Sequence, residues 1–528
     1  MTTYQEEKFP YWRDDSAVSK DQTTDCPKNQ ASNTFNIVLR IFNTLICCYL
    51  ICFLYKGKMY FIILRRDNFF MYDLALKNGF IVNENEIYLG NIYIQDEKIV
   101  EISLADKPAN EVYDVSGKYL LPGCIDTHCH FRDPGATAKE DFTTGTQAAI
   151  AGGVTTVFDM PNTNPSVLNE QDLLQKANYF APKAFADYGI WGLSLGEINL
   201  GDLPRLCEAG ASAVKFFWGY AINAKTKALI YNYNPKDEDI IPPLGDGEVY
   251  EIFEQMAKTG KIIAIHAENI ELIQTLTKRL QQSGKKDYEA LIQSRPALAE
   301  ALTIQTASLL AKATGARLHI LHLTSKMGME AVAQAKANGI NITAETCPQY
   351  LFLSAKDYDS VGPMMKVYPV IKHEEDRLAL WQGLKNGTID FIASDHAPHI
   401  ISEKQGDLFS IPAGMCGVET MLPLMLNEVN NGHITLPFLV KVMAKNVADI
   451  YNLPNKGNLE IGKDADIVVV DMNKVDTIEN EKLHSKQPLT AFAGRKIKGW
   501  PIKTFLRGQL VVDNNKICQD KACGKWIK

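Results

Sequence analysis

The middle of the chain alternates short apolar segments with longer amphipathic ones, and this alternation restricts the possible folds more than any other feature. Eight segments are expected to be strands: LLPGCIDTHCH, GVTTVFDM, DYGIWGLSL, AVKFFWG, IIAIHAE, RLHILHL, NITAETC and TIDFIASD. Helix-like stretches such as EVYEIFEQMAKTG and KMGMEAVAQAKANG separate them, and several end at glycine, as helices often do. Eight strands, each followed by a helix, are what a (β/α)₈ barrel requires. We therefore predict an α/β fold with a TIM-like (β/α)₈ barrel over residues 121–454.

Residues 71–120 and 455–528 flank the predicted barrel and have a different pattern. They contain short alternating segments, such as EIYLGNIYIQDEKIVEI and IKTFLRGQLVVDNNKI, which are broken by turn sequences such as DEK. This pattern is typical of antiparallel hairpins. Because both flanks show it, we expect them to form one small β-sandwich domain together.

Residues 1–70 differ from the rest of the chain. Residues 1–34 are polar and patternless, and we expect them to be disordered. Residues 36–66 are apolar and basic, with an uncharged core of 15 residues, shorter than the ~20 that span a bilayer. One interpretation is a membrane anchor; a cleaved signal peptide is disfavoured because no small-residue cleavage site follows. We favour a third interpretation, in which residues 1–70 are not part of the working protein and Met71 is its natural start.

The composition is that of an ordinary globular enzyme. A net charge of −7 over 528 residues gives no indication of nucleic-acid binding. The 11 cysteines are scattered and form no CxxC pair, which argues for reduced thiols and a cytoplasmic protein. We expect a small-molecule substrate, no nucleic-acid partner, and no membrane partner unless residues 36–66 form an anchor.

The first predicted strand runs into the segment DTHCHFRDPG, which contains two closely spaced histidines. Side chains alternate faces along a strand, so His128 and His130 point the same way. Two imidazoles that converge in this way form half of a site for a transition metal such as zinc. Taken alone, such a pair is more often two core or surface histidines, so the interpretation depends on the other strands.

Other predicted strands carry candidate metal ligands at the same end, where the chemistry of such barrels gathers. His266, His322 and Asp395 end the fifth, sixth and eighth strands. Lys215 lies in the apolar fourth strand, where an unpaired lysine is costly to bury. If CO₂ carbamylated its amine, Lys215 would instead become an anionic ligand able to bridge two metal ions. His319 points to the opposite face from His322 and is expected to be a core residue.

With these residues in place, the chain resembles the cyclic amidohydrolases of the amidohydrolase superfamily: dihydroorotases, hydantoinases or dihydropyrimidinases, and allantoinases. The resemblance covers residues 71–517 and implies a distorted barrel, a small β-domain and two zinc ions. By motif, the more buried zinc would be bound by His128, His130 and Asp395. The second would be bound by His266 and His322, and carboxylated Lys215 would bridge the two ions.

The resemblance also implies a reaction. A hydroxide held between the two metal ions attacks the ring amide, and Asp395 would carry its proton to the leaving nitrogen. Members of this family are frequently dimers or tetramers, so a homo-oligomer is expected by analogy.

Three residues outside the metal ligands indicate the branch of the family. The chain resembles dihydroorotases at Arg132 in HFR, Asn162 in DMPNTNP and His399 in DHAPH, and again at PAGMCGVET. Dihydroorotate carries a carboxylate, for which arginine, asparagine and histidine offer hydrogen-bond donors. The alternative for Arg132 is an ion pair with Asp133 or Glu140, and for Asn162 it is turn chemistry beside two prolines.

Two departures point towards another branch. Tyr220 lies five residues beyond Lys215, where hydantoinases place a tyrosine that binds the oxyanion, although its ring could simply pack on the barrel rim. The segment ETCPQYLFL resembles the ETCPHYL of hydantoinases and allantoinases, with Gln349 where histidine is usual. Because those branches do not usually carry an arginine at the position of Arg132, we favour a dihydroorotase, which interconverts N-carbamoyl-L-aspartate and L-dihydroorotate in pyrimidine biosynthesis.

Three alternatives stay open. The chain could be a hydantoinase or dihydropyrimidinase, or an allantoinase. More remotely, it could be a non-catalytic scaffold relative, although such proteins lose ligands and all six ligand positions are retained here. Residues 401–414 are either a mobile lid over the site or a plain surface loop.

Overall fold

The computed structural model describes residues 48–55, 58–65, 71–230, 233 and 238–528, and the chain divides into two units between Phe70 and Met71. In the first unit, strands β1 (Cys48–Tyr55) and β2 (Lys58–Arg65) pair antiparallel. The described part of the predicted apolar segment is therefore strand. The disorder predicted for residues 1–34 lies outside the described residues. Among the helices in the described ranges, none combines the length and the apolar character needed to cross a bilayer.

The centre of the second unit consists of two parallel sheets. The first has the order β10-β9-β8 and the second the order β11-β12-β16-β17-β18-β19. Most of these strands are buried along their whole length, as expected for parallel strands covered on both faces. Their bounds are β8 (Cys124–Cys129), β9 (Val154–Asp159), β10 (Asp187–Ile190), β11 (Gly192–Leu193), β12 (Val214–Phe217), β16 (Ile262–His266), β17 (Arg317–Ile320), β18 (Ile342–Thr346) and β19 (Phe391–Ile392).

Two contacts connect these sheets. β10 pairs with β9, and β11, which follows it after one residue, pairs with β12. At the other edge, a parallel bridge joins Cys129 of β8 to His396, four residues after β19. The predicted mixed α/β fold is thus confirmed, and closure into one (β/α)₈ barrel stays a prediction that these contacts favour.

Helices follow most of the parallel strands, as the alternation predicts. Gly260 and Gly315 adopt left-handed φ values of 66° and 78° directly after α5 and α8, which explains why glycine ends those helices. The longer helices are α2 (Phe142–Ala151), α3 (Glu170–Phe180), α4 (Leu203–Glu208), α5 (Asp246–Thr259), α6 (Ile270–Ser283), α7 (Tyr288–Ser294), α8 (Ala297–Thr314), α9 (Lys326–Ala337), α12 (Glu374–Asn386) and α13 (Met421–Asn430). Shorter helices are α10 (Pro348–Phe352), α11 (Tyr358–Val361), α14 (Leu436–Val440) and α15 (Asn446–Ile450).

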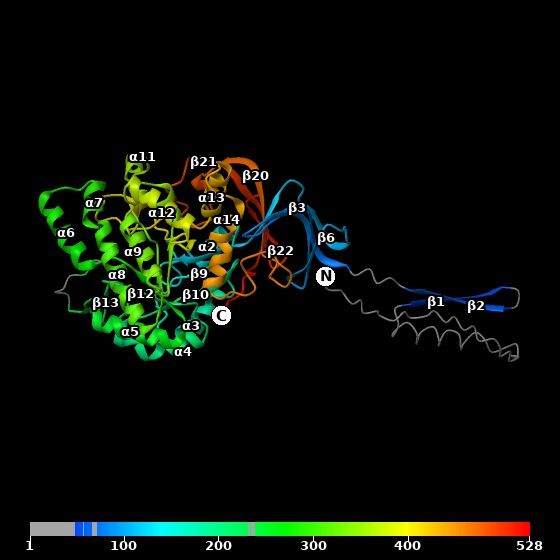
Figure 1. The fold of residues 1–528 in the computed structure, drawn as a ribbon, viewed down its shortest axis with the longest axis horizontal. Coiled ribbons are helices and arrows are strands. Elements are labelled where there is room, and N and C mark those ends of the chain that lie inside the picture. Colours follow the sequence, from blue (N-terminus) through cyan, green and yellow to red (C-terminus); the bar gives the residue numbers. More distant parts are fainter. Residues whose placement is uncertain (1–47, 56–57, 66–70, 231–232, 234–237) are drawn as a thin grey trace, which may run out of the picture. The chain divides into compact units, whose positions relative to one another are not determined.

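The two flanks of the chain pair in one nine-stranded sheet of order β23-β22-β21-β20-β7-β3-β4-β5, with β6 on β3. Figure 1 shows β3 and β6, from the start of this unit, beside β20 and β22 from its end. The two flanks thus pair in one hydrogen-bonded sheet, and its folding into a sandwich stays a prediction. Its strands are β3 (Tyr72–Val82), β4 (Ile87–Gln95), β5 (Lys98–Ser103), β6 (Ala109–Asp114), β7 (Tyr119–Pro122), β20 (Ile467–Thr477), β21 (Lys496–Leu506), β22 (Gln509–Asp513) and β23 (Lys516–Ile517).

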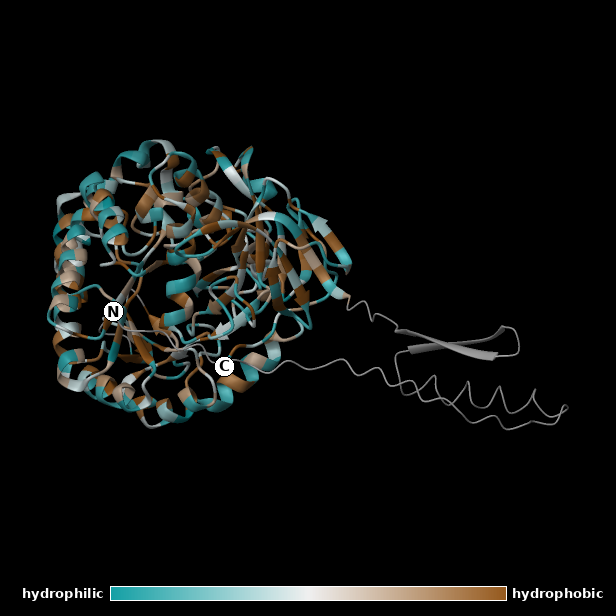
Figure 2. Cartoon of the chain, turned by 45° about the vertical axis from the view of Figure 1, so that its right-hand side comes forward, coloured by the Kyte–Doolittle hydropathy of each residue, from teal (hydrophilic) through white to brown (hydrophobic). Residues whose placement is uncertain are grey.

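A small sheet of three short strands lies outside these assemblies, with β13 (Ala221–Asn223) between β14 (Leu229–Ile230) and β15 (Ile240–Ile241). Figure 2 shows apolar strands in the interior of the second unit, and helices whose surfaces mix polar and apolar residues around them. The parallel strands thus lie in the interior, and the side chains considered next are at or just beyond their C-terminal ends.

Candidate active site

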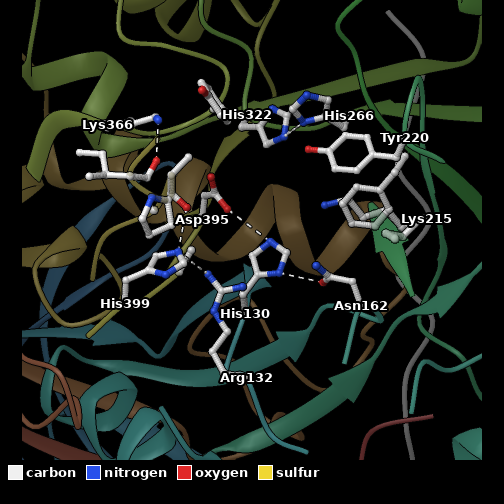
Figure 3. A pocket seen from close by; sticks show the side chains of 18 of the residues that line it. His130, Arg132, Asn162, Lys215, Tyr220, His266, His322, Lys366, Asp395 and His399 are labelled. Carbon is white, nitrogen blue, oxygen red and sulfur yellow. Dashed lines mark hydrogen bonds and ion pairs between the residues drawn. The ribbon is translucent and has the colours of Figure 1, made fainter. Parts of the chain in front are cut away.

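The predicted metal ligands lie together where the parallel strands end. His128 is in β8, Lys215 is in β12 and His266 ends β16, whereas His322 and Asp395 follow β17 and β19 by two and three residues. These five are buried, and His130, one residue beyond β8, is partly buried. Figure 3 shows His130, Lys215, His266, His322 and Asp395 around one cavity. Strands far apart in the sequence thus deliver all six predicted ligands to one place.

Three of these residues form a compact group. The Nε2 atoms of His128 and His130 lie 3.4 and 3.5 Å from Oδ1 of Asp395. One ligand atom from each of the three residues fits within 4.8 Å of the others, so a single metal ion could be bound by all three. The amine of Lys215 lies 3.5 Å from Nε2 of His128, at the edge of this group.

The other two histidines form a pair beside this group. Nδ1 of His266 lies 3.0 Å from Nε2 of His322, and the His322 ring centre lies 5.3 Å from that of His128. Nδ1 of His322 is buried and has no hydrogen-bond partner among the residues that the structure describes. Imidazole nitrogens and carboxylate oxygens are donors that suit zinc, so these residues fit the two-metal centre that the resemblance implies.

Side chains behind the histidines determine which nitrogen faces the centre. Nδ1 of His128 contacts Oε1 of Glu345 at 2.5 Å, Nδ1 of His130 contacts Oδ1 of Asn162 at 2.9 Å, and Nε2 of His266 contacts Oε2 of Glu268 at 2.9 Å. Metal-binding histidines usually donate their second ring N–H in this way. The expected metal-facing atoms are therefore Nε2 of His128 and His130, and Nδ1 of His266.

Glu268 and Glu345 were not among the site residues predicted from the sequence. Glu268 follows His266 by two residues, the spacing that places side chains on one face of a strand, so the HAE triplet was an available signal. Glu345 also lies 3.3 Å from Nε2 of His319. His319 is fully buried, as predicted, and its ring contacts the carboxylate that orients His128.

The electrostatics of the group favour neutral, metal-binding side chains. Burial, together with the neighbouring Lys215, holds the pKa values of His128 and His130 well below the usual value, so both keep a lone pair for a metal ion. Burial also lowers the pKa of Lys215 to about 8, although Asp395 opposes the shift. Only the neutral amine reacts with CO₂, so this shift favours carboxylation. Burial raises the pKa of Asp395 to about 6, against the opposing attraction of Lys215.

Backbone strain coincides with the site. Arg132, His322 and Asp395 have φ values of 62°, 38° and 49°, which residues other than glycine seldom adopt. Such residues often cluster at functional sites, where the surrounding structure holds them in place.

The residues predicted to bind a carboxylate line the same cavity, whose volume is about 370 Å³. Nη2 of Arg132 lies 3.3 Å from Nε2 of His399, and Nε of Arg132 donates to the carbonyl of Pro398 at 3.3 Å. Burial, reinforced by Arg132, lowers the pKa of His399 to about 3, so His399 is neutral. Its Nε2 donates to the carbonyl of Ala413 at 2.9 Å. Asn162 contacts His130 through Oδ1, which leaves its Nδ2 donor for another partner.

The structure excludes the alternative ion pairs considered for Arg132. Asp133 pairs with Lys183 at 2.8 Å and accepts a hydrogen bond from Tyr179 at 2.7 Å. Glu140 accepts from the backbone N–H groups of Asp141 and Lys486. In the described part of the chain, no carboxylate lies within 4.0 Å of the Arg132 guanidinium.

Tyr220 and part of residues 401–414 complete the cavity. Tyr220 packs edge-on against His266, with ring centres 5.6 Å apart, and burial raises its pKa, so its hydroxyl remains a donor. Its ring thus lines the cavity as well as packing against a neighbour. Residues 409–414 form one wall of the cavity, and both interpretations of residues 401–414, a mobile lid and a plain surface loop, stay predictions.

Comparison with known proteins identifies a family and several close matches. The chain matches the Amidohydrolase family over residues 119–511. It is 32% identical to an L-hydantoinase from Paenarthrobacter aurescens, over 87% of this chain and 98% of the relative. It is 33% identical to an allantoinase from Enterococcus faecalis, over 86% and 99%, and 36% identical to a dihydroorotase from Pyrococcus horikoshii, over 84% and 93%.

Solved structures of hydantoinases also resemble the chain over most of its length. An L-hydantoinase (dihydropyrimidinase) from Arthrobacter aurescens superposes with a TM-score of 0.81 at 31% identity, covering 87% of this chain and 100% of that one. A D-hydantoinase superposes with a TM-score of 0.77 at 29% identity, covering 86% and 98%. Hydantoinases, allantoinases and dihydroorotases thus match over similar lengths, and overall similarity does not distinguish between their activities.

Proposed function

Since the chain belongs to the amidohydrolase family and is a hydrolase of cyclic amides, we propose that its substrate is L-dihydroorotate. The reaction would be the reversible conversion of N-carbamoyl-L-aspartate to L-dihydroorotate in pyrimidine biosynthesis. Dihydroorotate carries a carboxylate, which dihydrouracil, hydantoin and allantoin lack. The choice between them therefore depends on whether the cavity accepts an anion.

The guanidinium of Arg132 is the observation that carries this proposal. It lies in the cavity beside the candidate metal ligands, and no carboxylate of the described residues pairs with it. A desolvated cation is costly without a counter-charge, and a substrate carboxylate would supply one through paired N–H donors. The Nδ2 group of Asn162 offers a further donor. An uncharged ring would supply no counter-charge to Arg132.

We further propose a centre of two zinc ions. His128, His130 and Asp395 would hold one ion, His266 and His322 the other, and carboxylated Lys215 would bridge them. The proposal is supported by the convergence of six residues of suitable chemistry and by the hydrogen bonds behind three of the histidines. Zinc supplies Lewis acidity to the ring carbonyl and acidifies water.

The side chains around this centre would bind the ring and move the proton. Arg132, Asn162 and His399 would orient the ring through its carboxylate. Asp395 would take a proton at its carboxylate and pass it to the leaving nitrogen, acting first as general base and then as general acid. Tyr220, protonated and directed into the cavity, would donate to the carbonyl oxygen.

The remaining predictions concern the architecture and setting. We propose that the two parallel sheets close into one distorted (β/α)₈ barrel, supported by the bridge between Cys129 and His396. We retain a homo-oligomer and a cytoplasmic location as proposals, together with the division into residues 1–70, 121–454 and a β-domain from 71–120 and 455–528.

Tyr220 favours a second candidate, a hydantoinase, dihydropyrimidinase or allantoinase. Its ring packs edge-on against His266 at the cavity, and its hydroxyl would serve an uncharged ring equally well. The solved structures of hydantoinases that superpose on the chain add to this alternative. A non-catalytic scaffold is set aside because the chain is a hydrolase.

Substitution of Arg132 tests the proposed substrate. Arg132→Met removes a charge-assisted contact worth ~1.5–3 kcal/mol, so the KM for L-dihydroorotate should rise about tenfold or more. The KM for dihydrouracil should change far less. Arg279→Met, at an exposed position of α6, is the matched control for loss of one positive charge. Equal effects of Arg132→Met on both substrates would remove Arg132 from a carboxylate pocket and contradict the proposal.

A further inference from the structure

Residues 411–414 form a wall of the cavity in which four successive carbonyls are each bound by a lysine or a histidine. Nε2 of His399 donates to the third of them, at Ala413, over 2.9 Å. Lys404 donates to the second and fourth, at Pro412 and Gly414, over 3.1 and 3.0 Å. Lys366 donates to the first, at Ile411. Backbone carbonyls thus serve as acceptors for donors that face or adjoin the cavity.

Lys404 uses its hydrogen-bonding capacity within the protein. An ammonium group has three N–H donors. Those of Lys404 reach three carbonyls, because Nζ also lies 3.0 Å from the carbonyl oxygen of Lys366. Lys404 is buried and does not line the cavity. Its role is therefore to hold residues 412–414 in place.

Lys366 differs from Lys404 in its position and in its number of hydrogen bonds. It lines the cavity, and Figure 3 shows its amine pointing inwards, towards the carbonyl that it binds. Among the described residues, the Ile411 carbonyl is the one hydrogen-bond acceptor of the Lys366 amine, and no carboxylate lies within 4.0 Å of that amine. Burial, reinforced by Arg295, lowers its pKa to about 8, which leaves it mostly protonated near neutral pH. Lys366 thus has a positive charge without a counter-ion, and N–H donors beyond the one that binds Ile411.

The position of Lys366 complements that of Arg132. Ile411 and Ala413 are two residues apart, so their carbonyls lie within about 7 Å of each other along the chain. The donors bound to them, Lys366 and His399, therefore border the same part of the cavity, and Arg132 lies 3.3 Å from His399. Because His399 is neutral, Lys366 is the lysine outside the metal centre that brings positive charge to this cavity.

We propose that Lys366 determines substrate specificity by binding a carboxylate of the substrate, while the Ile411 carbonyl occupies that donor in the free enzyme. The inference rests on the proposed function, because it requires an anionic substrate. It adds a second cationic contact to that of Arg132. A lysine suits this exchange, since its flexible stem lets the amine move from the carbonyl to a ligand.

Lys366→Met tests the proposal, with Lys404→Met as the matched control. Both variants remove a buried lysine that binds the same wall, but only Lys366 lines the cavity. The measurement is kcat/KM for L-dihydroorotate and for dihydrouracil on the full chain. We expect Lys366→Met to lower the ratio of the two values about tenfold or more. Lys404→Met should affect both substrates alike, and Lys366→Arg should restore part of the ratio.

The outcomes separate this inference from the proposed function. If the unsubstituted chain shows no preference for L-dihydroorotate, the proposed function fails, and this inference fails with it. If the preference exists and Arg132→Met abolishes it, but Lys366→Met leaves the ratio unchanged, only the role of Lys366 is overturned. A ratio that falls equally in Lys404→Met and Lys366→Met would show that Lys366 merely supports the wall.

Discussion

The orientation of the candidate zinc ligands is set by single side chains behind them. The period of two along a strand predicts that His128 and His130 share a face, and the structure shows them together. It does not predict that Glu345, 217 residues away, contacts His128. Asn162 was predicted to bind substrate, with turn chemistry as the alternative, and the structure adds its contact with His130. Such partners come from other strands, so no local pattern reveals them.

Glu268 offers a test at this scale because it connects the cavity to the protein interior. It contacts His266 on one side and accepts a hydrogen bond from Nε of Arg295 at 3.1 Å on the other. Glu268→Gln keeps the size but removes the charge that strengthens the His266 N–H bond. We expect zinc affinity at one of the two sites to fall about 10–100-fold.

Zinc content measured against a competing chelator checks this expectation independently of activity. Glu271→Gln, exposed on α6 three residues away, is the control. If Glu268→Gln bound both zinc ions as tightly as the unsubstituted chain, Glu268 would not orient a zinc ligand.

At the scale of elements, alternation predicted the order of strands and helices but not every boundary. The expected strand LLPGCIDTHCH divides at Gly123 into β7 and β8, which belong to different sheets. A Cβ at Gly123 would lie 2.0 Å from the hydroxyl of Thr155, so close packing requires glycine there. The expected strand TIDFIASD is regular only at Phe391–Ile392. An apolar run shows that a segment is buried, but not which sheet it joins.

A buried charge network ties the parallel strands to the nine-stranded sheet. Nζ of Lys456 lies 2.6 Å from Asp187 of β10, 3.0 Å from Asp464 and 2.5 Å from Asp466, which precedes β20. These carboxylates raise the pKa of Lys456 against the effect of burial. The network is the kind of contact that composition cannot predict, since its members are up to 279 positions apart.

Lys456→Met should therefore destabilise the protein strongly. It leaves buried carboxylates without their shared cation, a loss that costs about 3–5 kcal/mol. Chemical denaturation measures the change in the free energy of unfolding. Lys336→Met is the comparison, because its pair with Asp390 is partly exposed and should contribute about 1 kcal/mol or less. A similar, small effect of both substitutions would show that the buried network contributes little.

At the scale of the whole molecule, the two ends of the second unit cooperate. Strands from residues 72–122 and 467–517 share one sheet, as the similar patterns of the flanks suggested. The last residues contact the parallel strands, because a bridge joins Trp526 to Tyr188 of β10. No sequence pattern indicated this contact, because it depends on the path that the chain takes after its last strand, β23.

The cavity is built from residues of many separate parts of the second unit. Its metal-ligand candidates come from five parallel strands, and its donors Arg132, His399 and Lys366 come from three separate loops. The family and the similar relatives establish hydrolysis of a cyclic amide, and we propose that these donors decide which ring is accepted.

The most direct measurement is kcat/KM for L-dihydroorotate, dihydrouracil, hydantoin and allantoin on the zinc-loaded full chain. We predict a preference for L-dihydroorotate of about a hundredfold or more, because an uncharged ring would forfeit two charge-assisted contacts of ~1.5 kcal/mol each. A preference for an uncharged ring would contradict the proposed anion pocket. It would instead assign the chain to the hydantoinase or allantoinase branch, with Tyr220 as the informative residue.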